Sequence, residues 1–160
     1  MSEFSALDSL RAINATAPFN RWMGLEVVDA SRGHAEIRMK WRPEAAQYAG
    51  FLHAGLIGAL IDTACGFAAA TLGRRVMASH FQVNCMAPGV GAAFVAKGAV
   101  VKAGRRQIFT RADLYAEGDA GALKLIASGE TILLSVEDEA GGAATAQNAI
   151  RSNSTESSFQ

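Results

Sequence analysis

Apolar and polar residues alternate with two different periods along the chain. Residues 5–15 repeat leucine and isoleucine at helical spacing, which predicts a short amphipathic helix that ends at Pro18. A turn is expected over residues 18–24. Residues 25–30 and 34–41 are then predicted to be two strands joined by a short turn. Residues 34–41 alternate with a period of two, which is typical of a strand with one solvated face.

An apolar run of nineteen residues follows, from Ala54 to Leu72. This run is too long for a strand and suits a helix of about five turns. Its length would also permit a membrane span. However, Asp62 lies near the middle of the run, and a carboxylate in lipid costs a few kcal/mol. We therefore expect a helix inside a protein core and no insertion into a membrane.

Four further strand-like runs cover residues 75–86, 92–104, 105–117 and 122–137, with a local irregularity expected at Gly98. Strands at hairpin spacing favour antiparallel pairing. The pattern therefore predicts an α+β fold, with a six-stranded antiparallel sheet against one long helix. Because the helix is apolar nearly all round, one sheet face cannot cover it. We expect a second copy of the chain to cover the rest.

Composition divides the chain into three parts. We expect an N-terminal helical segment over residues 1–17 and a single folded domain over residues 18–137. Residues 138–160 are rich in Gly, Ser, Thr and Asn and hold hardly any large apolar residue, which indicates a disordered tail.

Charge and cysteine content exclude several classes of function. Fifteen basic residues balance fifteen acidic residues without a basic stripe, which argues against nucleic acid as a partner. The three histidines are scattered, and Cys65 and Cys85 belong to no ligand cluster, so we expect no metal site. Two reduced thiols in apolar stretches, and a first segment without a secretory leader, favour a cytoplasmic protein.

Asp62 is the candidate catalytic residue. It lies on a helix ridge whose other positions, 54, 58 and 66, are Ala or Gly. An unpaired buried charge is costly, so this carboxylate needs either a partner or a task. The functional interpretation is a general base or nucleophile whose pKa is tuned by burial. The alternative interpretation is that Asp62 bonds to a serine, a backbone amide or an arginine and only fixes packing.

The start of the same helix, His53-Ala54-Gly55, offers free backbone N–H groups at the positive end of the helix dipole. Such groups can stabilise a developing oxyanion. His53 and Asp62 are nine residues apart, which is about 13 Å along a helix axis and half a turn around it. One helix cannot bring both to the same substrate atom, but two antiparallel helices can. If both features are catalytic, two subunits must share the site.

At these positions the sequence resembles the PaaI-like branch of hotdog-fold acyl-CoA thioesterases. The cue of that family is Asn or Gln, five residues, then His-Gly-Gly, and an acid nine positions after the histidine. The matching positions here are Gln47, His53, Ala54, Gly55 and Asp62. The resemblance extends over about residues 18–136. Ala54 stands where glycine is usual in the family, and it keeps its backbone N–H.

The resemblance implies a hotdog fold, in which the sheet wraps around the central helix, and hydrolysis of an acyl- or aryl-CoA to a carboxylic acid and CoA. No further cofactor is implied, since CoA is part of the substrate. Asp62 would be the nucleophile or general base. The N–H of Ala54, with Gly55 nearby, would polarise the thioester carbonyl. His53 would orient this loop, and Gln47 would position water or the carbonyl.

Three further residues take roles from the resemblance. His80, eighteen positions after the acid, would hold the water or assist the leaving thiolate. Arg105 and Arg106 would contact the CoA phosphates. Simpler alternatives stay open, in which His53 only caps the helix, His80 is a half-buried strand residue, and the two arginines are solvated.

The expected assembly is a homodimer, or a dimer of dimers. Two other functions also stay open. A hotdog hydratase or dehydratase would use His53 and Asp62 on the alkyl chain, and a non-catalytic module would bind acyl-CoA without turning it over. The sequence does not select the acyl group.

Overall fold

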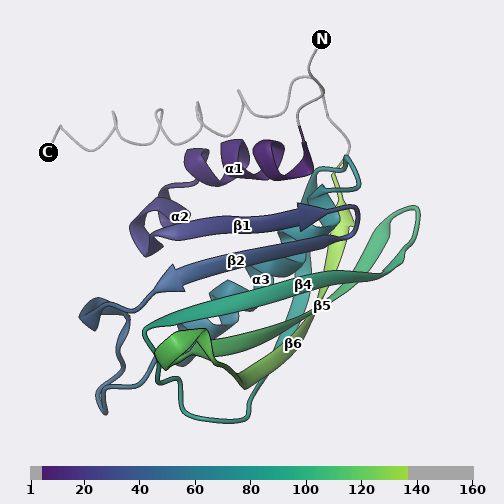
Figure 1. Ribbon diagram of the computed structural model, residues 1–160. Coiled ribbons are helices and arrows are strands. Elements are labelled where there is room, and N and C mark those ends of the chain that lie inside the picture. Colours follow the sequence, from purple (N-terminus) through teal and green to yellow (C-terminus); the bar gives the residue numbers. More distant parts are fainter. Residues whose placement is uncertain (1–4, 137–160) are drawn as a thin grey trace, which may run out of the picture.

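The computed structural model describes residues 5–136, and its architecture is α+β (Figure 1). Six antiparallel strands form one sheet in the order β1-β2-β4-β5-β6-β3, which confirms the predicted fold class. The predicted tail at 138–160 lies outside the described residues. The elements are α1 (Ala6–Thr16), α2 (Pro18–Met23), β1 (Leu25–Ser31), β2 (His34–Lys40), η1 (Pro43–Ala45), α3 (Ala54–Ala70), β3 (Val76–Cys85), β4 (Ala93–Ala103), β5 (Gln107–Glu117), η2 (Asp119–Gly121) and β6 (Leu123–Ser135).

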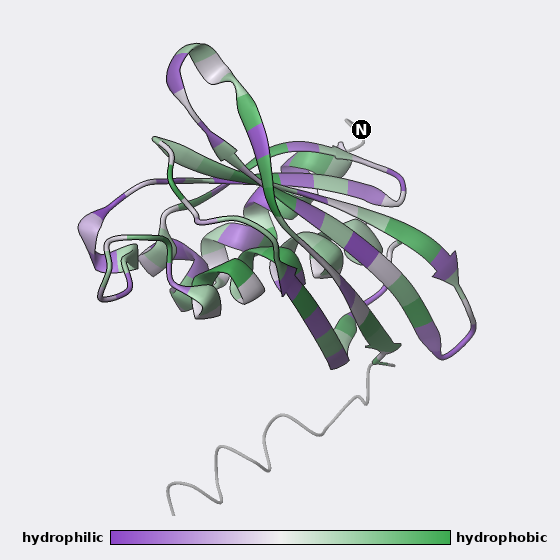
Figure 2. Cartoon of the chain, turned by 90° about the horizontal axis from the view of Figure 1, so that it is seen from below, coloured by the Kyte–Doolittle hydropathy of each residue, from purple (hydrophilic) through white to green (hydrophobic). Residues whose placement is uncertain are grey.

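The long helix α3 packs across one face of the sheet and contacts β2 to β6. Strand residues alternate between this face and the opposite one, and Figure 2 shows the resulting bands of apolar and polar residues along the strands. On β5, for example, Ile108, Thr110 and Leu114 are buried, whereas Phe109 and Arg111 are exposed. The predicted pattern of one apolar face and one solvated face is confirmed.

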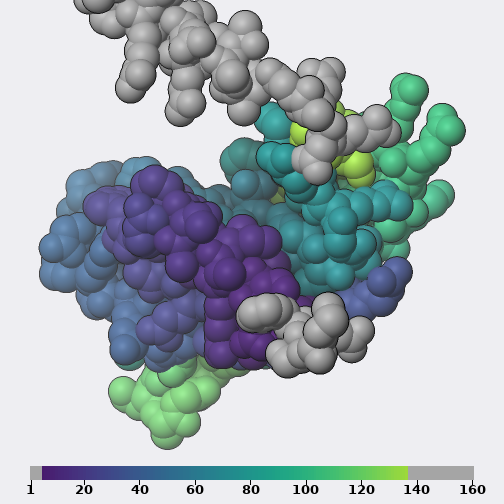
Figure 3. All heavy atoms as spheres, turned by 90° about the horizontal axis from the view of Figure 1, so that it is seen from above, coloured from purple at the N-terminus to yellow at the C-terminus, as the bar shows by residue number. Residues whose placement is uncertain are grey.

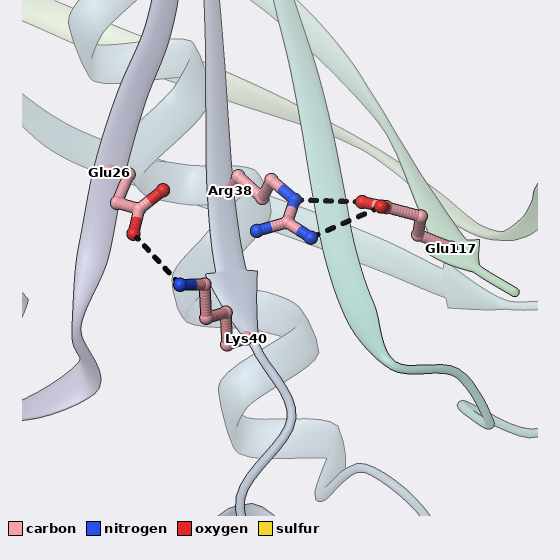
Figure 4. Close-up of polar contacts among 4 residues, drawn as sticks. All are labelled: Glu26, Arg38, Lys40 and Glu117. Carbon is pink, nitrogen blue, oxygen red and sulfur yellow. Dashed lines mark hydrogen bonds and ion pairs between the residues drawn. The ribbon is translucent and has the colours of Figure 1, made fainter. Parts of the chain in front are cut away.

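Charged side chains occupy the outer face of the sheet, away from α3 (Figure 4). Arg38 on β2 donates two hydrogen bonds to the Glu117 carboxylate on β5, at 2.7 and 3.1 Å, and so bridges the intervening strand β4. Its neighbours Ile37 and Met39 point to the other face and are fully buried. The outer face is therefore polar where the inner face is core.

Gly98 is the point at which α3 crosses the sheet most closely. A Cβ at this residue would lie 2.3 Å from the carbonyl oxygen of Ala64 on α3, so only glycine fits. The strand pairs regularly through this position, and the irregularity of β4 falls between Val100 and Lys102. The predicted irregularity at Gly98 is therefore wrong. The glycine is there for close packing of two backbones.

The predicted N-terminal helix is confirmed as α1, but the turn predicted over residues 18–24 is wrong. Pro18 ends α1 and also begins the short helix α2, where a missing N–H costs nothing because the first helical residues have no acceptor. Gly24 then ends α2 with a positive φ of 65°.

The N-terminal helices pack on the edge of the sheet and belong to the same folded body. Leu10 of α1 is buried in the core cluster. The Asn14 side-chain amide donates to the carbonyl of Leu25 on β1 at 2.8 Å. Figure 1 shows α1 lying along β1. At the other edge of the sheet, β3 is a ten-residue strand that pairs only with β6 within residues 5–136. No helix in this range has the length and hydropathy of a bilayer-spanning segment.

Candidate active site

The start of α3 carries one backbone N–H that is left unbonded. His53 caps the helix, since its Nδ1 accepts a hydrogen bond from the Gly55 N–H at 2.9 Å. The N–H groups of Leu56 and Ile57 donate to the carbonyl of His53. Among residues 5–136 no acceptor faces the N–H of Ala54, which is exposed. Ala54, rather than Gly55, is therefore the free donor at this positive helix end.

Gln47 lies in the loop that leads into α3. The loop is closed by a bridge between Ala46 and Leu52, and the His53 N–H donates to the carbonyl of Ala45 at 2.9 Å. The side-chain oxygen of Gln47 accepts from the N–H of Ala49 in its own loop. Gln47 therefore orders its own loop before the helix, and its side-chain oxygen is bonded within that loop.

Asp62 lies in the middle of α3 with its carboxylate half-buried. Its Oδ1 is buried and makes no hydrogen bond within the described chain. Burial raises the pKa of Asp62 from its ordinary value of 3.8, and the nearby Thr131 hydroxyl partly opposes this shift. A carboxylate with a raised pKa and an uncommitted oxygen has the properties of a general base or nucleophile.

A hollow of about 700 Å³ adjoins Asp62. Its walls are the N-terminal helices, the second half of α3 and the beginning of β3. Figure 3 shows this recess from above, between the purple atoms of the N-terminal helices and the teal atoms that follow α3. Most of the lining is apolar or small, and includes Ile13, Gly66, Phe67, Ala70, Val76 and Leu133. The hollow can therefore hold an apolar or extended group beside the carboxylate.

Arginines lie at one end of the hollow, where Arg74 and Arg75 contribute to its lining. The Arg74 Nη1 donates to the carbonyl of Gly104 at 2.6 Å, which holds this segment against the turn between β4 and β5. Arg105 and Arg106 are exposed in that same turn. These four residues, which we call the arginine end, bring basic charge from two loops to one place.

His80 lies on the outer face of the sheet. On β3 it alternates with Phe81 and Val83, which face α3, and it lines a shallow hollow with Gln82 and Phe109 on the opposite face. The sheet therefore separates His80 from Asp62 within one chain. Its predicted role at the site has no support in this placement.

Apart from His80, the predicted site residues fall into two groups. Asp62, the hollow and the arginine end belong together, whereas Gln47, His53, Ala54 and Gly55 lie at the other end of α3. Sequence reasoning missed Thr131, which is 1% exposed and faces Asp62 from β6. No three His, Cys, Asp or Glu side chains within residues 5–136 gather as metal ligands.

Comparison with known proteins identifies the family of the chain. The family model of the Thioesterase superfamily matches residues 49–122. A thioesterase family protein from Silicibacter pomeroyi has a similar structure, with 30% identity and a TM-score of 0.77 over 82% of this chain and 98% of that chain. No protein of curated function matches the sequence significantly.

Two further solved structures resemble the chain. Zebrafish thioesterase superfamily member 2 is 25% identical, with a TM-score of 0.73 over 83% of this chain and 100% of that chain. The E. coli PaaI protein from the phenylacetic acid degradation operon is 17% identical, with a TM-score of 0.74 over 82% and 94% of the two chains, and supports the fold alone. With its six-stranded sheet around α3, and with this match in sequence and structure, the chain belongs to the thioesterase superfamily and has its hotdog fold.

Proposed function

We propose that this protein hydrolyses acyl-CoA thioesters and that Asp62 is its catalytic carboxylate. The observation that carries the proposal is the buried, unbonded Oδ1 of Asp62 in the wall of the hollow. Among the described residues this carboxylate has no ion-pair partner, and a desolvated charge of that kind is costly unless it serves chemistry. Family membership supports the reaction type.

The chemistry requires one water molecule and two proton movements. As a general base, Asp62 takes a proton from water while the oxygen adds to the thioester carbonyl carbon. The C–S bond then breaks, and the thiolate of CoA leaves and receives a proton. As a nucleophile, Asp62 would instead form an anhydride that water opens. Both routes need a donor to the carbonyl oxygen as it becomes negative.

The N–H of Ala54 in a second subunit is the proposed donor. Ala54 and Asp62 are eight residues apart on α3, about 12 Å along the axis, so the two cannot meet within one helix. A homodimer in which the α3 helices approach in antiparallel fashion would bring Ala54 of one copy to Asp62 of the other. The exposed edge of β3, with Met77 64% and Phe81 50% exposed, supports a dimer at this side of the molecule.

The arginine end is the proposed contact for the phosphates of CoA. Arg105 and Arg106 lie in an exposed turn that Arg74 ties to the far end of the hollow. A CoA ester bound there would extend through the hollow toward Asp62. Arginine suits this role because its planar fork binds phosphate oxygens in pairs.

A thiol-release assay with a panel of acyl-CoA and aryl-CoA esters tests the function. We expect turnover of at least one ester, and we expect Asp62→Asn to lower kcat by at least about 100-fold, the scale of a general-base contribution. The matched control is Asp29→Asn, which makes the same change at an exposed residue of β1 and should leave kcat unchanged. Circular dichroism establishes that each variant is folded.

The same panel separates the alternatives. Addition of water to an enoyl-CoA without thiol release would indicate a hydratase. Binding of acyl-CoA without any turnover would indicate a binding module. If Asp62→Asn hydrolysed the best ester at the parent rate, the assignment of Asp62 would be wrong even though the function held.

A further inference from the structure

Two buried polar atoms without partners lie beside each other at the interface between α3 and β6. Thr131 is 1% exposed, and within residues 5–136 its hydroxyl has no hydrogen-bond partner of good geometry. The same is true of Oδ1 of Asp62. Buried polar atoms are almost always hydrogen-bonded, because an unpaired one loses its water without replacement. One of these atoms belongs to a hydroxyl donor and the other to a carboxylate acceptor.

We propose that Thr131 is a positioning residue, whose hydroxyl donates to Oδ1 of Asp62 and holds the carboxylate for reaction through its other oxygen. The two groups already interact electrostatically, so a small shift of either side chain pairs both atoms at once. Because a carboxylate only accepts, the pairing also fixes the orientation of the whole side chain. The inference rests on the proposed function, since it gives Thr131 a task in the reaction at Asp62.

The neighbouring groups leave Thr131 available for this bond. The hydroxyl of Thr110 on β5 is committed, since it donates to the carbonyl oxygen of Thr131 at 2.8 Å. Cys65 on α3 lies among Thr110, Thr131 and Asp62, and burial raises the pKa of its thiol, so it stays protonated and uncharged. The Thr131 hydroxyl is therefore not committed to Thr110, and Asp62 is the charged group with which it interacts across the interface.

The titratable groups around Asp62 come from few elements. Cys65 is the one on α3 itself, and Arg74 and Arg75 lie at the far end of the hollow. The residues that α1, α2, β3 and β6 contribute to the lining of the hollow carry no titratable side chain: they are Ile13, Thr16, Asn20, Val76, Ala78 and Leu133. Thr131 on β6 is thus the uncharged donor on the sheet that influences the pKa of Asp62.

Two opposing effects then act on the carboxylate. Burial favours its protonated form, and a donated hydrogen bond favours its ionised form. A general base or nucleophile must be ionised to react. By this account Thr131 lowers the pH at which Asp62 becomes ionised, while burial raises it.

The test compares Thr131→Val, Thr131→Ser and Thr110→Val in the full chain. Valine replaces the hydroxyl by a methyl group of similar shape, and serine keeps the hydroxyl. We expect Thr131→Val to move the acid limb of the kcat/KM profile to higher pH, so that at a fixed pH on that limb the rate falls on the order of tenfold. Thr131→Ser should restore the parent profile. Thr110→Val, equally buried, should leave the limb in place.

A second measurement does not depend on turnover. The carboxylate band of Asp62 can be titrated by infrared difference spectroscopy, with Asp62→Asn as the blank, and Thr131→Val should move its midpoint to higher pH. An unchanged midpoint and an unchanged acid limb in folded Thr131→Val would overturn the inference. A moved midpoint in a protein that hydrolyses no ester would uphold the contact and reject the proposed function instead.

Discussion

Burial raises the pKa of Asp62 above its ordinary value of 3.8, so the folded chain keeps this proton to a higher pH than the unfolded chain does. At a pH between the pKa of Asp62 in the unfolded chain and its pKa in the folded chain, folding takes up one proton. The free energy of unfolding therefore decreases as the pH rises through that window, and the full penalty is reached above it. Under the proposed function, stability at this residue is exchanged for a reactive carboxylate.

The expected result is that Asp62→Asn is more stable than the parent at pH 7 and loses this advantage near pH 3, where the acid is protonated in both states. Urea denaturation at several pH values measures the difference. Asp29→Asn is again the control, because it removes an exposed charge from β1. Equal stability of Asp62→Asn and the parent across the whole pH range would show that the carboxylate is not desolvated.

The first turn of α3 holds the proposed oxyanion donor, the N–H of Ala54, and a single substitution can remove that N–H. Ala54 is the first residue of the helix, and His53 before it has the extended conformation that a following proline requires. Proline is well tolerated at this position and removes only the N–H. Ala54→Pro should therefore fold and bind substrate but lose about 100-fold in kcat, as expected for one oxyanion donor.

The matched variant is Ala54→Gly, which keeps the N–H and shortens the side chain. Steady-state kinetics on the best ester should give Ala54→Gly a kcat close to that of the parent. A folded Ala54→Pro with the parent kcat would place the oxyanion donor elsewhere.

The elements were predictable to the extent that they depend on local pattern. Strand-like runs separated by turns located the six strands, and length and hydropathy located α3. The helix α2 was missed because Pro18 both stops one helix and starts another, and the letters PFNRWMG carry no periodicity long enough to reveal a single further turn. The conformation of a segment at such a boundary depends on the residues that it packs against.

Long-range placement was less accessible from the sequence. The spacing of Asp62 from His53 was visible, but the position of Thr131 behind Asp62 depends on how β6 pairs in the sheet. Gly98 is a second example. Only glycine fits at this position because the backbone of Ala64, thirty-four residues earlier, lies against it. His80 was assigned by spacing along the chain, whereas the bulge between Ala78 and His80 and the pleat of β3 decide its face.

At the scale of the whole molecule, the two reactive features of α3 point to a site made by two copies. Each dimer would hold two sites, and each site would take Asp62 from one subunit and Ala54 from the other. Mixing inactive Asp62→Asn with inactive Ala54→Pro should therefore create hybrid dimers with one intact site. With random exchange of equal amounts, about a quarter of the parent activity should return.

Subunit exchange must be verified in that experiment, for example by energy transfer between labelled copies. Exchange without any recovered activity would mean that each chain builds its site alone. Unmixed samples of each variant provide the baseline.

The separation of Ala54 from Asp62 along one helix has a further consequence for cells that carry two versions of this chain. A copy that lacks both features at once leaves neither site complete in a hybrid dimer, although its partner is intact. Such a copy would act as a dominant inhibitor, and its effect on activity would exceed its share of the protein.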